Sequence, residues 1–127
     1  MGRTRSATLT DGELRLMRVL WARGRSTVSD IVGGLGPGMS PAYNTVQTMM
    51  RILERKGYVR HRKEGRAFVF EPVIDQSQAR RSALRYVLDR FFDNSPQTLV
   101  LSLLEDRQVD AAELADLRDL VRRREAR

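Results

Sequence analysis

The stretch from Ser40 to Gly57 constrains the fold most, because it carries helix signals at both ends and two chemically different faces. Ser40 and Pro41 are typical of an N-cap and a first helical position, and Gly57 is placed for a left-handed C-terminal cap. At about 100° per residue, one side of the predicted helix is apolar and contains Ala42, Val46, Met49, Met50 and Leu53. The opposite side is polar and cationic, and contains Asn44, Gln47, Thr48, Arg51 and Arg55.

Two helices are predicted before this segment. The first begins at a capping box formed by Thr10 and Glu13 and ends at Gly24. Its apolar residues follow at helical spacing, and the last of them is expected in the core: Leu14, Met17, Leu20 and Trp21. The second helix begins near Ser26 or Thr27 and is weakened by Gly33-Gly34.

A β-hairpin is predicted after the third helix. Residues 58–62 and 67–71 read as two strands, and Pro72 ends the second of them. The turn between the strands, at residues 63–66, is basic. Beyond Pro72 the pattern becomes wholly helical, with segments over about 75–92, from Ser95-Pro96, and from Asp110 with Glu113.

The net charge of +7 is concentrated in the first part of the chain. Residues 1–72 contain 13 Lys and Arg against 6 Asp and Glu, whereas residues 73–127 contain 10 of each. Clustered cations release counterions when they dock on a phosphate backbone, so the first part is expected to meet a polyanion. The alternative is a basic surface that serves only solubility.

The composition argues against several classes of protein. The chain of 127 residues has no cysteine and a single histidine, His61, so disulfides, thiolate metal sites and most catalytic constellations are not expected. We therefore expect no enzyme activity, no cofactor and no bound metal. No apolar run approaches the roughly 18 residues of a membrane span, and we expect a cytoplasmic protein without membrane insertion.

Three helices followed by a hairpin, with the third helix polar outside, is the layout of a winged helix-turn-helix. An α-helix fits the major groove, where amide side chains suit adenine and arginine suits guanine or phosphate. The expected DNA contacts are Ser40, Tyr43, Asn44, Thr45, Gln47, Thr48 and Arg51 on the helix, and Arg62, Lys63 and Arg66 on the hairpin. Tyr43 could equally be a half-buried packing residue. A polar outer face alone is typical of any surface helix.

Residues 42–57, which read AYNTVQTMMRILERKG, resemble the BlaI/MecI penicillinase-repressor family, as does the segment from Leu14 to Trp21. The resemblance extends more loosely over the C-terminal helices, including Thr98-Leu99-Val100-Leu101. Members of that family are bacterial homodimeric repressors that bind palindromic operators and dimerise through C-terminal helices. The resemblance implies the same here, and it places Asn44, Thr45, Gln47 and Thr48 opposite the bases.

The C-terminal helices bury little by themselves, since some 50 residues hide too small a fraction of their surface. A two-fold dimer would supply the missing core, although these helices could instead pack on the body of the same chain. The residues expected in the interface are Leu84, Val87, Leu88, Phe91, Leu99, Val100, Leu103, Leu117 and Val121. We therefore expect a mainly α chain, with a winged-helix domain and two-stranded wing over residues 1–73 and an all-α three-helix dimerisation domain over 74–127.

In some family members a membrane sensor-protease responds to β-lactam, and the repressor is cleaved in the helix that follows the first dimerisation helix. The resemblance places that cut at Ser102-Leu103, where better-known members have an Asn-Phe pair. Copper-responsive relatives bind metal through C-terminal cysteines, which this chain lacks. The expected function is a transcriptional repressor of a DNA operator; the alternative is an architectural winged-helix protein with little sequence preference.

Overall fold

The computed structural model describes residues 8–36, 41–106 and 108–126. The chain divides into two compact units, Met1–Tyr86 and Val87–Arg127, and α4 runs from the first into the second. The elements are, in order, α1 (Asp11–Arg23), β1 (Ser26–Thr27), α2 (Val28–Gly34), α3 (Tyr43–Arg55), β2 (Val59–Glu64), β3 (Ala67–Pro72), α4 (Gln76–Phe91), α5 (Pro96–Asp106) and α6 (Ala111–Glu125). The chain is therefore mainly helical, as predicted.

Side-chain caps start α1 and α6 where the sequence predicts them. The amide of Glu13 donates to the Thr10 hydroxyl at 3.1 Å, and the Glu13 carboxylate accepts from the Thr10 amide at 2.9 Å. Asp110 and Glu113 form the same box at the start of α6. These pairings satisfy amide groups that have no partner inside the helix, which fixes where each helix begins.

The start of α3 differs from the prediction. Ala42 is the N-cap, without a side-chain hydrogen bond, and Tyr43 is the first helical residue. The extended backbone of Ala42 (φ −61°, ψ 154°) is the reason, since helical hydrogen bonding begins only with the Val46 amide and the Ala42 carbonyl. Pro41 therefore precedes the helix, and Ala42 is exposed rather than part of the apolar face. The predicted N-cap Ser40 lies outside the described residues.

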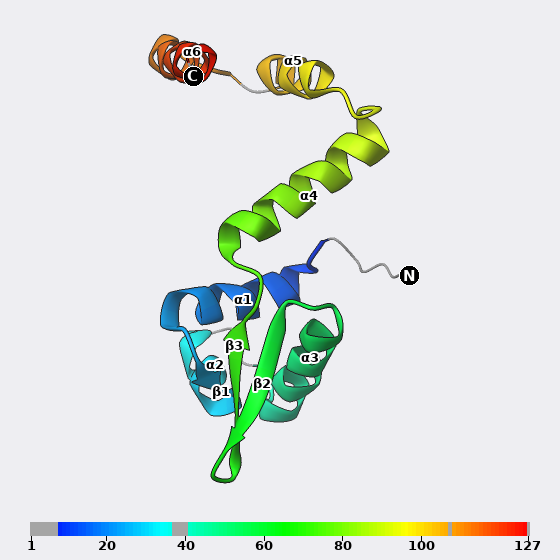
Figure 1. The fold of residues 1–127 in the computed structure, drawn as a ribbon, viewed down its shortest axis with the longest axis vertical. Helices are drawn as coiled ribbons and strands as arrows, with labels where there is room; N and C mark the ends of the chain where they lie inside the picture. Colours follow the sequence, from blue (N-terminus) through cyan, green and yellow to red (C-terminus); the bar gives the residue numbers. More distant parts are fainter. Residues whose placement is uncertain (1–7, 37–40, 107, 127) are drawn as a thin grey trace. The chain divides into compact units, whose positions relative to one another are not determined.

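The sheet has three antiparallel strands in the order β1-β3-β2. The hairpin turn is shorter than predicted, because Glu64 pairs with Ala67 and only Gly65 and Arg66 form the loop. Gly65 has a φ of +62°, which suits the first loop position of a type II′ turn. The hairpin extends beyond the ends of α2 and α3, as a wing does (Figure 1).

The strand β1 was not predicted. Ser26 pairs with Phe70, and Thr27 pairs with Val69. Thr27 is also the N-cap of α2, where it forms a capping box with Asp30. The two-residue strand therefore joins the start of α2 to the root of the wing.

The core lies in the first unit, between the three helices and the sheet. The residues that form it are Leu16, Met17, Val19, Leu20, Val28, Ile31, Val46, Met50, Leu53, Tyr58, Val59 and Phe70. Trp21 packs against this core, as predicted, and is partly buried; its indole N–H donates to the Ile74 carbonyl at 2.9 Å. That bond connects α1 to the segment that leads into α4.

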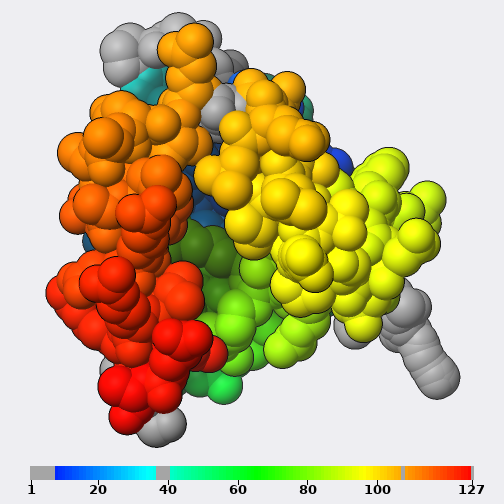
Figure 2. Space-filling view, turned by 90° about the horizontal axis from the view of Figure 1, so that it is seen from above, coloured from blue at the N-terminus to red at the C-terminus, as the bar shows by residue number. Residues whose placement is uncertain are grey.

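The second unit contrasts with the first, because none of the described residues of α5, α6 or the end of α4 is buried. Large apolar side chains stand in solvent on these helices, for example Phe91 at 71% and Leu103 at 52% exposure. Figure 2 shows the face of α5 (yellow to orange) and α6 (orange to red) with its side chains uncovered.

Candidate nucleic-acid interface

The outer face of α3 presents the side chains that the sequence assigned to DNA. Tyr43, Asn44, Thr45, Thr48 and Arg51 are exposed, and Gln47 is half-buried. Opposite them, Val46, Met50 and Leu53 are fully buried and hold the helix on the core. Tyr43 is 49% exposed, so of the two readings of this residue the packing role is the weaker one.

The hydroxyl of Thr48 donates to the Asn44 carbonyl at 3.0 Å, one turn back along the helix. This bond uses the hydroxyl proton inside the helix. A ligand could still contact the methyl group of Thr48 or donate to the lone pairs of its hydroxyl oxygen.

Two arginines add positive charge to this face. Arg51 and Arg55 are exposed, and neither forms an ion pair with any other residue in the described part of the chain. Arg55 was assigned to the outer face but not to the expected contacts. Its position one turn after Arg51 is the signal that would have included it.

The wing carries a cluster of ion pairs, which we call the wing cluster: Arg25, Arg60, Arg62, Glu64 and Glu71. Arg60 and Arg62 both donate to the Glu71 carboxylate, at 2.7 and 3.3 Å, and Arg25 pairs with Glu64. The hydrogen bonds from Arg60 and Arg62 hold the pKa of the Glu71 carboxyl below its ordinary value.

Arg62, one of the expected DNA contacts of the wing, forms ion pairs inside the wing cluster. Alternation along β2 places Arg62 on the face of Arg60 and Glu64, within reach of Glu71 on the neighbouring strand. Lys63 points to the other face, and Arg66 lies in the turn. Neither Lys63 nor Arg66 forms an ion pair with another described residue, so these two carry the free charge of the tip.

Contacts of His61 hold the wing against α3. The Nδ1 atom of His61 lies 2.8 Å from both carboxylate oxygens of Glu54 on α3. The imidazole also contacts Phe68 edge-on and lies tilted against Phe70. His61 is therefore a structural residue of an exposed strand, and it fixes the wing relative to the helix.

The far end of α3 is tied to α1. The Lys56 ammonium donates to the Glu13 carboxylate at 2.7 Å, and the side chain of Glu13 is only 6% exposed. Burial by itself raises the pKa of the Glu13 carboxyl, but the hydrogen bonds from Lys56 and Thr10 outweigh it and leave this pKa below its ordinary value. The sequence predicted the Thr10 contact and missed Lys56, which is distant along the chain.

The residues expected in a dimer interface lie on α4, α5 and α6. Leu84, Phe91, Val100, Leu103, Leu117 and Val121 are exposed, while Val87, Leu88 and Leu99 are half-buried. Four large exposed residues of the same helices were not assigned: Tyr86, Leu101, Leu104 and Leu120. Ser102 and Leu103, the expected cleavage position, lie in the middle of α5, where the backbone is helical.

No three His, Cys, Asp or Glu side chains of the described residues gather where they could hold a metal ion. None of the described helices combines the length and the apolar character that a membrane span needs.

Comparison with known proteins agrees with this geometry. The model of the penicillinase repressor family matches residues 9–123. A penicillinase repressor of Bacillus licheniformis is 32% identical over 109 residues, which cover 86% of this chain and 85% of that protein. The methicillin resistance regulatory protein MecI of Staphylococcus aureus strain N315 is 16% identical over 116 residues, or 91% of this chain and 94% of that protein.

Among solved structures, the DNA-binding domain of the repressor BlaI matches with a TM-score of 0.51 at 33% identity. The match covers 59% of this chain and 93% of that domain, and it confirms the predicted winged-helix fold. Because the family match spans nearly the whole chain, the protein belongs to the BlaI/MecI penicillinase-repressor family.

Proposed function

We propose that this protein is a transcriptional repressor that binds a DNA operator through α3 and the wing. The observation that carries the proposal is the outer face of α3, where exposed amide, hydroxyl and guanidinium groups stand opposite a fully buried apolar face. The names of the penicillinase repressor and MecI relatives support the same function.

The chemistry of this face suits the major groove. Asn44 and Gln47 each have a donor and an acceptor that match the edge of adenine, and Thr45 can offer a methyl or a hydroxyl. Arg51 suits guanine or phosphate. Arg55, which is exposed and unpaired among the described residues, joins the proposed contacts.

The proposed contacts of the wing are to the phosphate backbone, and they do not depend on the base sequence of the DNA. Lys63 and Arg66 carry charge that no described carboxylate neutralises, so their full charge is available to a phosphate backbone. Arg62 contributes less than these two, because Glu71 already accepts from it.

We further propose that two copies bind as a homodimer through α4, α5 and α6. The support is the set of large apolar side chains that these helices leave in solvent. Burial of one such Leu, Val or Phe side chain stabilises by about 1.5 to 3 kcal/mol, so an interface that covers the set favours association strongly. A two-fold dimer presents two copies of α3 to a palindromic site.

The test is selection of bound sites from random duplexes, followed by titration of the selected and a scrambled duplex by fluorescence anisotropy. A repressor should prefer its selected site by about 10³-fold or more. Equal affinity for both duplexes would replace this proposal with the architectural alternative.

Two substitutions then separate base reading from backbone binding. Gln47→Ala should cost about 1 to 3 kcal/mol at one base position, whereas Lys63→Ala should weaken both duplexes alike and lower the salt slope by about one. Gln97→Ala, at an exposed glutamine of α5, is the matched control and should change neither. Equal losses on both duplexes from Gln47→Ala would contradict base reading by α3.

A further inference from the structure

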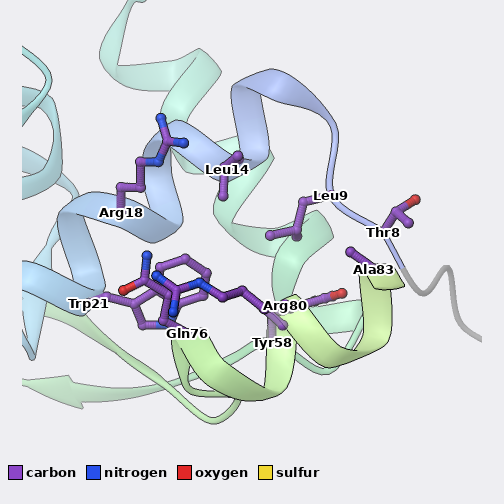
Figure 3. A pocket seen from close by; sticks show the side chains of 10 residues that line it. Thr8, Leu9, Leu14, Arg18, Trp21, Tyr58, Gln76, Arg80 and Ala83 are labelled. Atoms are coloured by element: carbon purple, nitrogen blue, oxygen red, sulfur yellow. The ribbon is translucent and has the colours of Figure 1, made fainter. Parts of the chain in front are cut away.

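A cavity of about 440 Å³ lies between α1 and the first turns of α4, wholly within the first unit. Its volume is in the range of roughly 300 to 1,000 Å³ that small-molecule sites occupy. Figure 3 shows the side chains that line it, which come from the segment before α1, from α1 itself, from Tyr58 just before β2 and from α4. None of the groups discussed above as a DNA contact lines this cavity.

The walls are mainly apolar and aromatic. Leu9, Leu14, Trp21 and Tyr58 form one side, and Ala79 with Ala83 forms the other. The indole N–H of Trp21 is already used by the Ile74 carbonyl, so the ring faces a ligand as an apolar surface. Small side chains on α4 leave the space open, since alanine reaches only as far as its Cβ atom.

The charged side chains that line the cavity are all positive. Arg18 comes from α1 and Arg80 from α4 (Figure 3), and no Asp or Glu lines the cavity. Neither arginine forms an ion pair with another residue of the described ranges, as is also true of Arg51, Arg55 and Arg66 in the same unit. Two exposed cations without a neighbouring carboxylate, beside aromatic walls, have the chemistry that suits an organic anion.

We infer that this cavity binds a small organic anion with an aromatic or aliphatic body. The carboxylate would accept from Arg18 and Arg80, and the body would cover Trp21 and the two alanines of α4. Gln76 at the edge offers an amide for one further hydrogen bond. The inference is independent of DNA binding and concerns the first unit alone.

The probe is 4-phenylbutyrate, compared with its neutral amide 4-phenylbutanamide, on the full chain without DNA. Trp21 is the only tryptophan, so its fluorescence and its single indole N–H resonance report directly on the cavity. The expected result is saturable binding of the anion that shifts both signals, with the amide about tenfold weaker. Shifts that appear on α5 and α6 but spare the indole would overturn the inference.

Matched variants separate a built site from general attraction to a basic surface. Arg18→Gln with Arg80→Gln should weaken the anion about tenfold and leave the amide unchanged. Arg15→Gln with Arg85→Gln removes two exposed arginines from the same helices outside the cavity and should change neither. Equal weakening of the anion by both double variants would reject the site.

Ala83→Trp fills the cavity and should abolish binding of both probes without changing the sedimentation coefficient. Circular dichroism and thermal unfolding verify that this variant folds. If instead the cavity receives a segment of a second copy, Ala83→Trp will weaken self-association and the probe will compete with it. That result would replace the small anion with a protein contact and overturn the inference.

Discussion

The two units of this chain contain helices of similar pattern and very different surroundings. In the first unit α1, α2 and α3 bury their apolar residues, and Leu20, Ile31 and Leu53 are fully inaccessible. In the second, α5 and α6 contain no buried residue among those described. Helical spacing of apolar residues therefore predicts that a face will be covered, but it does not tell whether the cover comes from the same chain.

The turns of the two units also differ in the residues that form them. Gly24, Gly57 and Gly65 adopt positive φ, and each ends a helix or turns a strand so that the next element returns to the core. No glycine follows residue 65. The end of α4 instead uses Asp93 and Asn94 in left-handed conformation, and the Asn94 amide donates to the Leu88 carbonyl.

The largest expected effect is the loss of stability caused by a cavity in the core of the first unit. Leu53→Ala should lower the free energy of unfolding by about 2 to 5 kcal/mol, because the fully buried side chain leaves a space that its neighbours fill only in part. Urea unfolding followed by circular dichroism measures it. The exposed Val73 is the control, and Val73→Ala should stay within about 0.5 kcal/mol.

This loss should not depend on protein concentration, because the core of the first unit comes from one chain. A loss that grows on dilution would contradict the division drawn between the two units, since it would show that a second copy completes this core.

The next effect concerns association through the second unit. Leu103→Asp should raise the dimer dissociation constant about 100-fold or more, since it takes a carboxylate into an apolar interface without a partner. Sedimentation velocity across a dilution series measures the constant. Leu103→Met retains the volume and apolar character and should change it little.

The first unit should remain folded in Leu103→Asp, because Leu103 contributes nothing to its core. A dissociation constant unchanged by Leu103→Asp would contradict the proposed interface and favour packing of these helices on the body of the same chain.

A smaller effect is the pH dependence that Glu13 gives to the stability of the first unit. Glu13 has a lowered pKa, so its contribution to stability is present above the ordinary pKa and is lost as the pH falls through the lowered one. Glu13→Gln should cost about 1 to 3 kcal/mol at neutral pH, because it leaves the Lys56 ammonium without its carboxylate.

The measurement is urea unfolding of both proteins between neutral and acid pH. The difference between them should shrink as the pH falls below the ordinary value of 4.5. Asp30 and Glu71 also have lowered pKa values and remain in both proteins, so their contributions cancel. A difference that is constant with pH would contradict the ion pair.

Local signals predicted most of the fold. The capping boxes of α1 and α6 and the positive φ of Gly57 were readable because each depends on residues within one helical turn. The strand β1 was not readable, because Ser26 and Thr27 form a strand only through their pairing with Phe70 and Val69.

In the candidate site too, local features could be predicted from sequence and contacts between distant residues could not. The outer face of α3 follows from helical period, and its exposed side chains were identified from sequence. The pairing of Arg62 with Glu71 depends on hairpin register, which places the two carboxylates of the wing cluster beside its arginines. The contact of Lys56 with Glu13 joins residues 43 positions apart, so no local sequence pattern predicts it.

The smallest expected effect compares two adjacent glycines of α2, Gly33 and Gly34. A Cβ atom at Gly33 would meet nothing within 4 Å, so Gly33→Ala should stabilise by about 0.5 to 1 kcal/mol through helix propensity. A Cβ atom at Gly34 would lie 2.7 Å from Cγ1 of Val19, a stiff side chain on α1. Gly34→Ala should therefore destabilise, although both glycines weaken the helix equally by propensity. Thermal unfolding of the two variants measures the difference, and a gain in stability from Gly34→Ala would show that α2 and α1 can move apart without cost.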